Sequence, residues 1–253
     1  MLFNNENNLK PCGIFSLGHF ILLTITFILI FIFLKKNKNK TESEVKNIIK
    51  KTTIFLWILE IIKIIYSIKT FGIKAINKYV PLYFCSLILY TGILSGFFNE
   101  KIKRIGDVFI STGGIVAGLV FLIYPLTSLP SYPMLHYISI QSFILHGAML
   151  YLGLLMHVTH YINLRQRDIV PYSILIITLG LIAYILNTFL DSNLMFVSKN
   201  YPGTFIELIY NTTGKIFPLF MISVQATIPF YFIYYTKKII NKHKCQNLYH
   251  NII

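Results

Sequence analysis

Residues 15–40 read FSLGHFILLTITFILIFIFLKKNKNK, an apolar run that ends abruptly in a segment of lysine and asparagine. A helix needs about 20 mainly apolar residues to cross a bilayer, and this run is long enough. Lys10 is the only basic residue before it, and no small-residue cleavage site follows it. We therefore expect a membrane-spanning helix that stays in the protein, rather than a signal peptide that is removed.

The rest of the chain has the same character. Of its 253 residues, 55% are hydrophobic and only 13% are charged, which is more apolar than a soluble domain requires. Apolar stretches of spanning length fall near 14–34, 52–69, 79–98, 105–125, 137–158, 171–190 and 216–236. The sequence therefore predicts an all-α, polytopic membrane helix bundle with about seven transmembrane helices.

The domain organisation follows from these spans. We expect a short extracellular N-terminus (1–13), a single transmembrane helical domain (14–236) and a basic cytoplasmic tail (237–253). The longest connection, about 191–215, leaves no room for a soluble domain. Any function must therefore lie inside the bundle or on its faces.

The basic residues predict the orientation of the bundle. If alternate connections lie on opposite sides, sixteen lysines and arginines fall on one side and six on the other. By the positive-inside rule the N-terminus is then outside and the C-terminus cytoplasmic. Because the lysines are separated by apolar runs, we expect membrane lipids as partners and no nucleic acid. The chain is rich in Ile, Lys, Asn and Phe, a composition typical of bacteria with AT-rich genomes. We therefore expect a multi-pass protein of a bacterial cell membrane.

Polar side chains within the spans mark the candidate site. They lie in the predicted outer half of the bilayer or near its midplane, and they are His19, Glu60, Cys85, His146, Asn187 and Gln225. Polar groups in hydrocarbon usually face the bundle interior or a wet cavity. We therefore expect one polar pocket that opens toward the outer leaflet. Ser139, Ser142, His146 and Gly153 follow helical steps, and they form a stripe that would line it.

A Cys–His pair is the most specific chemistry that these residues offer. His146 would act as general base and Cys85 as a nucleophile that attacks an acyl ester to give a thioester. Asn187 or Gln225 would orient the imidazole or hydrogen-bond the oxyanion. Each residue also has a structural interpretation: Cys85 as a small hydrophobe, and His146, Asn187 and Gln225 as links between helices.

Further features admit other interpretations. Glu60 is three residues from Lys63 and would pair with it on one helical face. His157 and His160 have a spacing that can chelate zinc, but only Asp168 lies nearby as a further ligand, so we expect no metal and no cofactor. Gly114 and Gly118 offer a small surface for close helix packing. Pro229 removes a helical donor and crowds the carbonyl of Gln225.

Several motifs carry a family resemblance. They include FSLGH at 15–19, VPLYFCS at 80–86, QSFILHG at 141–147 and NTFLDSNLMFVSKNYPG at 187–203. In this order they resemble the YwaF-type bacterial integral membrane proteins, which are similar to an animal multi-pass protein described as a phospholipid acyltransferase with a membrane Cys and His. More distantly they are similar to androgen-induced-gene-type membrane hydrolases that use a Thr and a His.

The resemblance implies catalytic roles for Cys85 and His146. His19, Glu60, Gln141, Asn187 and Gln225 would then contact the substrate. The chain departs from the family at Tyr83, where a His is frequent, and at GKIFPLF, where the last span begins. A tyrosine cannot replace a histidine as a base near neutral pH. The expected activity is acyl transfer or hydrolysis on a membrane lipid. The alternatives are a carrier or receptor for a small amphiphile and a structural membrane subunit.

Overall fold

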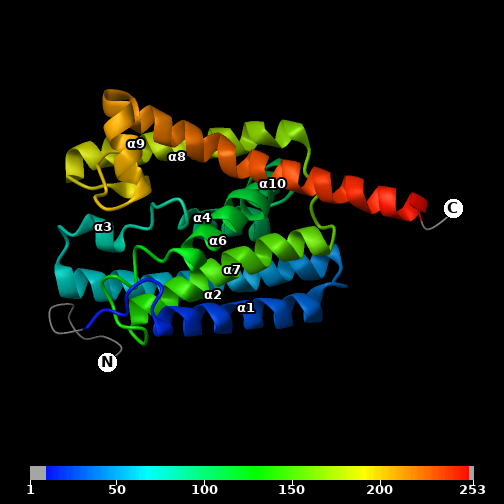
Figure 1. The fold of residues 1–253 in the computed structure, drawn as a ribbon, viewed down its shortest axis with the longest axis horizontal. Helices are drawn as coiled ribbons and strands as arrows, with labels where there is room; N and C mark the ends of the chain where they lie inside the picture. Colours follow the sequence, from blue (N-terminus) through cyan, green and yellow to red (C-terminus); the bar gives the residue numbers. More distant parts are fainter. Residues whose placement is uncertain (1–9, 251–253) are drawn as a thin grey trace.

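The computed structural model describes residues 10–250, with side chains placed through residue 242. The first nine residues of the expected extracellular N-terminus, the last three of the expected tail and the side chain of Cys245 lie outside the described residues. Within the described part every regular element is a helix (Figure 1). The predicted all-α class is therefore confirmed.

The longer helices overlap the seven apolar stretches of the sequence. In chain order they are α1 (Leu17–Asn37), α2 (Glu42–Phe71), α4 (Leu87–Phe97), α5 (Glu100–Phe109), α6 (Ile115–Ile123), α7 (Tyr137–Val158), α8 (Ile169–Leu190) and α10 (Phe217–His250). Shorter elements are α3 (Ile76–Tyr79), α9 (Phe205–Thr213), the π-helix η2 (Ile110–Gly114) that joins α5 to α6, and the 3₁₀ turns η3 (Gln166–Asp168), η4 (Leu194–Phe196) and η5 (Gly214–Ile216). Most of the expected tail is thus a continuation of α10.

Five described helices are long and apolar enough to span a membrane by length and composition. They are 17–37, the continuous 100–123, 137–158, 166–190 and 205–242. The other two predicted spans correspond to α2, which is long but carries several charges, and to α4, which has only 11 residues. At 1.5 Å per residue, α4 is about 16 Å long and too short to cross a bilayer alone.

The third span therefore requires a correction. We predicted a helix from residue 79, but residues 80–86 are irregular and α4 begins only at Leu87. Pro81 explains why the helix does not continue from Tyr79, because proline disfavours helical backbone at the preceding residue, Val80. Cys85 is consequently outside a regular helix.

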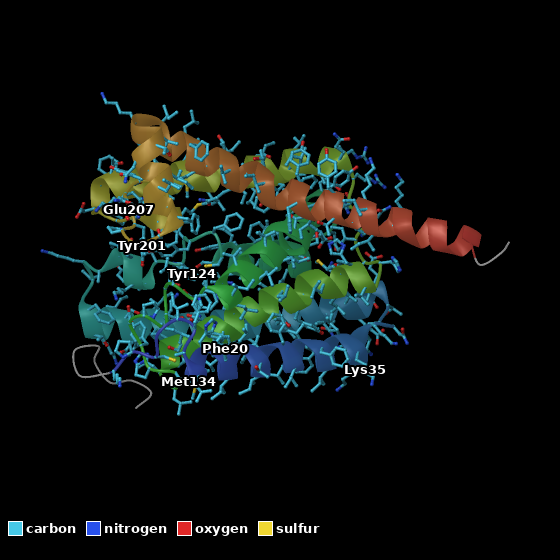
Figure 2. All side chains as sticks on the ribbon, in the orientation of Figure 1. Phe20, Lys35, Tyr124, Met134, Tyr201 and Glu207 are labelled. Atoms are coloured by element: carbon cyan, nitrogen blue, oxygen red, sulfur yellow. The ribbon has the colours of Figure 1, made fainter. Side chains whose placement is uncertain are left out.

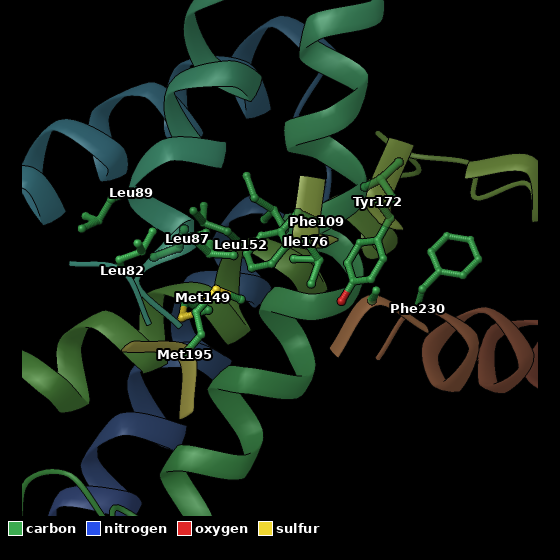
Figure 3. Close-up of a cluster of buried hydrophobic side chains, with 14 of the residues drawn as sticks. Leu82, Leu87, Leu89, Phe109, Met149, Leu152, Tyr172, Ile176, Met195 and Phe230 are labelled. Atoms are coloured by element: carbon green, nitrogen blue, oxygen red, sulfur yellow. The ribbon is translucent and has the colours of Figure 1, made fainter. Parts of the chain in front are cut away.

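The helices run side by side along one axis. α1, α2 and α7 form one side of the bundle, α8 and α10 form the other, and α4 to α6 lie between them (Figure 1). The central helices are mostly buried, whereas α1 and α8 expose most of their apolar side chains. Figure 3 shows the shared core, where Phe109, Tyr172 and Ile176 pack near Phe230. An apolar exterior around such a core is what a membrane-embedded bundle requires.

The two ends of the bundle differ. At one end, called here the lysine-rich end, lie the connection 38–41, the connection 159–165 and the C-terminal part of α10. α1 begins at the opposite end, where Figure 2 shows Tyr124 and Met134 far from Lys35. Thr41 begins α2 at the lysine-rich end through a capping box with Glu44, which satisfies two free helix donors.

Two predicted backbone features position neighbouring helices. Gly118 allows α6 to approach α7 closely, since a Cβ at this residue would lie 2.8 Å from the carbonyl oxygen of His146. Pro229 leaves the carbonyl of Gln225 without its helical donor, and the Tyr172 hydroxyl donates to this oxygen at 3.1 Å. The surface of small residues around Gly118 thus contacts α7, the helix that carries His146.

Candidate functional site

A polar cavity of about 490 Å³ lies at the end of the bundle where α1 begins. Its walls come from α2, α3, the segment 80–86, the connection after α6, the start of α7 and the loop 191–204 after α8. The side chains that line it include Lys63, Asn77, Lys78, Tyr83, Cys85, Ser86, Gln141, Ser142, His146, Asn193, Lys199 and Tyr201. Figure 2 shows Tyr201 at this end, between α3 and the segment that leads to α9.

Cys85 lines this cavity from the irregular segment before α4. It is partly exposed and carries a free thiol. Ser86 follows it as the N-cap of α4 and lines the same cavity. The thiol thus lies in a turn at the cavity wall and not within a regular helix.

His146 lines the cavity from α7, and its ring is held on two sides. Its Nδ1 lies 2.7 Å from the carbonyl oxygen of Ser142, and the ring stacks on Phe121 with centroids 3.6 Å apart. A carbonyl only accepts hydrogen bonds, so Nδ1 is the donor. In the neutral ring, Nε2 therefore carries the lone pair and is available as a base.

The two residues share the cavity without bonding to each other. In the described part of the chain no hydrogen bond joins the Cys85 thiol to the His146 ring, whose hydrogen bond runs to Ser142. Catalytic hydrogen bonds are often long without substrate and shorten when it binds. A substrate that fills the cavity would therefore lie against both side chains.

Glu60 and Gln141 form a buried polar link beside the cavity. Gln141 Nε2 donates to Glu60 Oε2 at 2.9 Å, and the other carboxylate oxygen, Oε1, contacts the ammonium of Lys63. The expected pairing of Glu60 with Lys63 is thus present. Gln141 and Lys63 line the cavity, whereas Glu60 does not. Its carboxylate instead fixes two side chains that do.

Asn187 organises the loop 191–204 and does not line the cavity. Its Oδ1 accepts hydrogen bonds from the Leu194 N–H at 2.7 Å and the Ser192 hydroxyl at 2.6 Å. Its Nδ2 donates to the Leu194 carbonyl and to the Ser198 hydroxyl. All hydrogen-bonding groups of this buried amide serve the loop, which forms one wall of the cavity.

Gln225 holds the same loop from α10. Its Nε2 donates to the carbonyl oxygen of Met195 at 3.0 Å. Met195 is a buried non-glycine residue with a φ of 54°, a left-handed conformation that such residues adopt rarely. Gln225 does not line the cavity itself; its side chain contacts the loop that forms one cavity wall.

His19 lies away from this cavity. Its Nε2 is 2.9 Å from the Leu122 carbonyl, and its Nδ1 accepts from the Phe15 N–H. Both ring nitrogens thus join the start of α1 to its surroundings. The predicted stripe on α7 also divides: Ser142 and His146 line the cavity, whereas a Cβ at Gly153 would touch Ile115.

The histidines at the end of α7 have other partners. His157 Nε2 donates to the carbonyl of Ser111 in the π-helix, and its Nδ1 lies 3.0 Å from the Lys237 ammonium. His160 adopts a φ of 56° in the following turn. Among the described residues, no group of three or more His, Cys, Asp or Glu side chains could hold a metal ion.

Asn77, Tyr83 and Asn193 are among the lining residues that were not predicted as site residues. Tyr83 donates to Asn77, and Asn77 Oδ1 accepts from the backbone N–H of Asn193 at 2.8 Å. These bonds join α3 and the segment 80–86 to the loop after α8. Asn193 belongs to the motif NTFLDSNLMFVSKNYPG, so its place in the sequence was a signal. Asn77 stands in no motif that we recognised.

A second cavity, of about 520 Å³ and mainly apolar, lies between α1, α2 and α7. None of the seven candidate site residues lines it. Gly147, next to His146, belongs to its wall, so α7 separates the two cavities.

Comparison with known protein families agrees with this architecture. The model of the TMEM164 family matches residues 14–236, which include every residue that lines the polar cavity. The chain belongs to the TMEM164 family. As a TMEM164-family member it is a multi-pass integral membrane protein. No curated protein and no solved structure matches the chain.

Proposed function

We propose that this protein transfers or hydrolyses an acyl group of a membrane lipid through a thioester on Cys85, with His146 as the base. The observation that carries the proposal is that both side chains line one polar cavity in a membrane-embedded bundle. The resemblance of VPLYFCS and QSFILHG to YwaF-type proteins and to a Cys/His phospholipid acyltransferase supports the same roles.

The first half of the reaction would acylate the protein. The Cys85 sulfur attacks the ester carbonyl carbon while its proton passes to His146 Nε2. The C–S bond forms, the ester C–O bond breaks, and His146 returns the proton to the departing alcohol. A thiol ionises poorly in a low-dielectric cavity, so this step depends on the base.

The second half would release the acyl group. A hydroxyl of a second lipid, or water, attacks the thioester while His146 Nε2 takes its proton. The C–S bond then breaks, and the thiol is restored with the proton from His146. Because Nδ1 stays bonded to the Ser142 carbonyl, the ring keeps one orientation through both halves. The acceptor decides whether the result is transfer or hydrolysis.

A binding function without catalysis is the second candidate. The specific observation in its favour is that no hydrogen bond joins Cys85 to His146 in the described residues, and the His146 ring is held in place by Ser142 and Phe121. In a carrier or receptor, the cavity would hydrogen-bond the headgroup of a small amphiphile. The two functions differ in one product, the thioester.

Intact-protein mass spectrometry after incubation with mixed bacterial phospholipids tests the proposal. We expect an acyl-sized mass gain that hydroxylamine removes, lost in Cys85→Ala and strongly reduced in His146→Asn. Cys12→Ala and His160→Asn are matched controls, since neither residue lines the cavity. Absence of an adduct with every lipid class, in protein shown to be folded, would refute the enzymatic function and favour binding.

A further inference from the structure

The second cavity, called here the α1–α2 groove, opens toward the lipid that surrounds the bundle. Its floor is α7 and its walls are α1 and α2, three helices that lie side by side in Figure 1. Phe143 and Gly147 are buried in the floor, whereas Ile25, Leu29 and Phe55 on the walls are half-exposed. The volume of about 520 Å³ is therefore reached sideways, from the membrane.

The groove follows one face of each helix over the length of a lipid chain. Its lining residues run from Leu22 to Asn37 on α1 and from Ile140 to Tyr151 on α7, at intervals of three and four residues, which is the spacing of a single helical face. At 1.5 Å per residue the groove is about 16–22 Å long. One leaflet occupies about half of the 30 Å hydrocarbon core, roughly 15 Å.

The width of the groove decides what can occupy it. Its volume divided by its length gives a mean cross-section of roughly 24–32 Å². A helix of a second copy or of a partner has a diameter of about 10–12 Å, which requires about 80–110 Å². A single hydrocarbon chain, whose carbon contacts need a channel about 4–5 Å across, requires roughly 13–20 Å². One chain fits, whereas a helix does not.

The polar groups of the groove are at its lysine-rich end. Asn37 Nδ2 donates to the Tyr151 hydroxyl at 3.0 Å and to the Phe33 carbonyl at 2.9 Å. In the described part of the chain, the Tyr151 hydroxyl proton then has no acceptor, so it can donate to a ligand. Among the described residues that line the groove, none is charged. The carboxylate of a free fatty acid would therefore lack a counter-ion, whereas an ester carbonyl needs only one donor.

We propose that the α1–α2 groove binds one acyl chain of a phospholipid, with the ester at Tyr151 and Asn37 and the headgroup at the lysine-rich end. The second acyl chain would stay in the bilayer. Lipid tails are as apolar as the groove, so the affinity comes from close packing against three helices and from the hydrogen bond at the ester. The proposed acyl chemistry plays no part in this inference, since α7 separates the groove from the polar cavity.

Retained lipid provides the test. The full-length protein is purified in detergent and washed extensively, and the lipid that remains bound is identified and counted by mass spectrometry. We expect one phospholipid per chain, because the groove is wide enough for a single chain. Tyr151→Phe should lower the retained amount about fivefold, the factor that one hydrogen bond provides.

Two substitutions fill the groove from different sides. Leu29→Trp acts from α1 and Ala148→Phe from the floor, and each should lower the retained phospholipid about tenfold or more, as overpacking does. The matched control is Ile28→Trp. Ile28 is the neighbour of Leu29 and similarly exposed, 53% against 46%, but it does not line the groove. This variant should retain as much phospholipid as the parent.

Four results would overturn the proposal. The first is a parent protein that retains no phospholipid, and the second is an equal loss in Ile28→Trp. The third is retention in both filled variants, each shown to be folded by its thermal transition. In the fourth, the retained molecule is a free fatty acid, or the parent forms a lipid-free dimer that Leu29→Trp dissociates. Because the lipid is bound without a covalent bond, a failed thioester assay would leave this inference standing.

Discussion

Replacement of Gly118 by alanine tests whether contact between α6 and α7 positions His146. A Cβ at Gly118 would lie 2.8 Å from the His146 carbonyl oxygen and 3.1 Å from the Leu150 backbone nitrogen. Both atoms belong to the backbone, so the two helices must separate by a few tenths of an ångström. Overpacking of this kind costs about 1–3 kcal/mol, while alanine is favoured over glycine in a helix by about 1 kcal/mol.

Gly114→Ala provides a control four residues earlier. A Cβ there would approach only the Phe109 carbonyl oxygen, at 3.5 Å, which is ordinary contact. Both substitutions share the gain in helix propensity, so the Gly118 variant should be less stable than the Gly114 variant by about 1–3 kcal/mol. For a chain of this size, each kcal/mol lowers the Tm by about 2–4 °C.

Thermal unfolding in detergent measures this difference, and the single tryptophan, Trp57, supplies the fluorescence signal. Since the clash falls on the backbone of His146, thioester formation should also fall roughly tenfold in Gly118→Ala, because small displacements of a catalytic group are costly. Equal Tm values for the two variants would refute the packing argument. Equal thioester formation with a lowered Tm would show that the contact stabilises the bundle without positioning the base.

Three other measurements test separate contacts. Asn187→Ala removes four hydrogen bonds from a buried site and should lower the free energy of unfolding by about 2–4 kcal/mol. Trypsin should then cut the loop 191–204 faster than in the parent protein. An unchanged cleavage rate would contradict the role of Asn187 in holding this loop. Glu60→Gln should lower stability by about 3 kcal/mol, because Lys63 loses its partner in a buried pair, and a Tm within about 1 °C of the parent would argue against this pair. Hydrogen bonding from Lys40 lowers the pKa of exposed Glu44 from 4.5 to about 2. The capping of α2 by Glu44 should therefore be complete above pH 4.5 and be lost only as the pH falls toward 2. An NMR titration of the Glu44 carboxyl with a midpoint near 4.5 would contradict this prediction.

Much of the fold follows from local sequence. Long apolar runs that end in lysine-rich segments predict helices because lipid offers no partner for free backbone groups. That reasoning succeeded for α1, α7 and α8, and it failed for residues 80–86, where the apolar run continues but the backbone is irregular around Pro81. Hydropathy measures apolar character and not backbone conformation, so it does not predict this irregular segment, although Pro81 in the sequence indicates a break.

The candidate site was less accessible to such reasoning. Predicted depth in the membrane grouped His19 and Asn187 with Cys85 and His146, because all four fall in the outer half or near the midplane of their predicted spans. Depth does not specify the direction in which a side chain points or the neighbour that it meets. In the structure His19 hydrogen-bonds to the end of α6, and Asn187 hydrogen-bonds to the loop that follows its helix. Cys85 and His146, in contrast, line one cavity.

The sequence by itself determined that this chain is an all-helical membrane protein, since composition and apolar length depend on each residue separately and need no partner. The tertiary structure alone decided which polar groups meet. It placed Cys85, His146 and three lysines from distant segments around one cavity, and it turned Asn187 and Gln225 toward the loop that closes it. Contacts between side chains from distant segments depend on the rotation of each helix and on close packing at residues such as Gly118. Both are set only when the helices assemble.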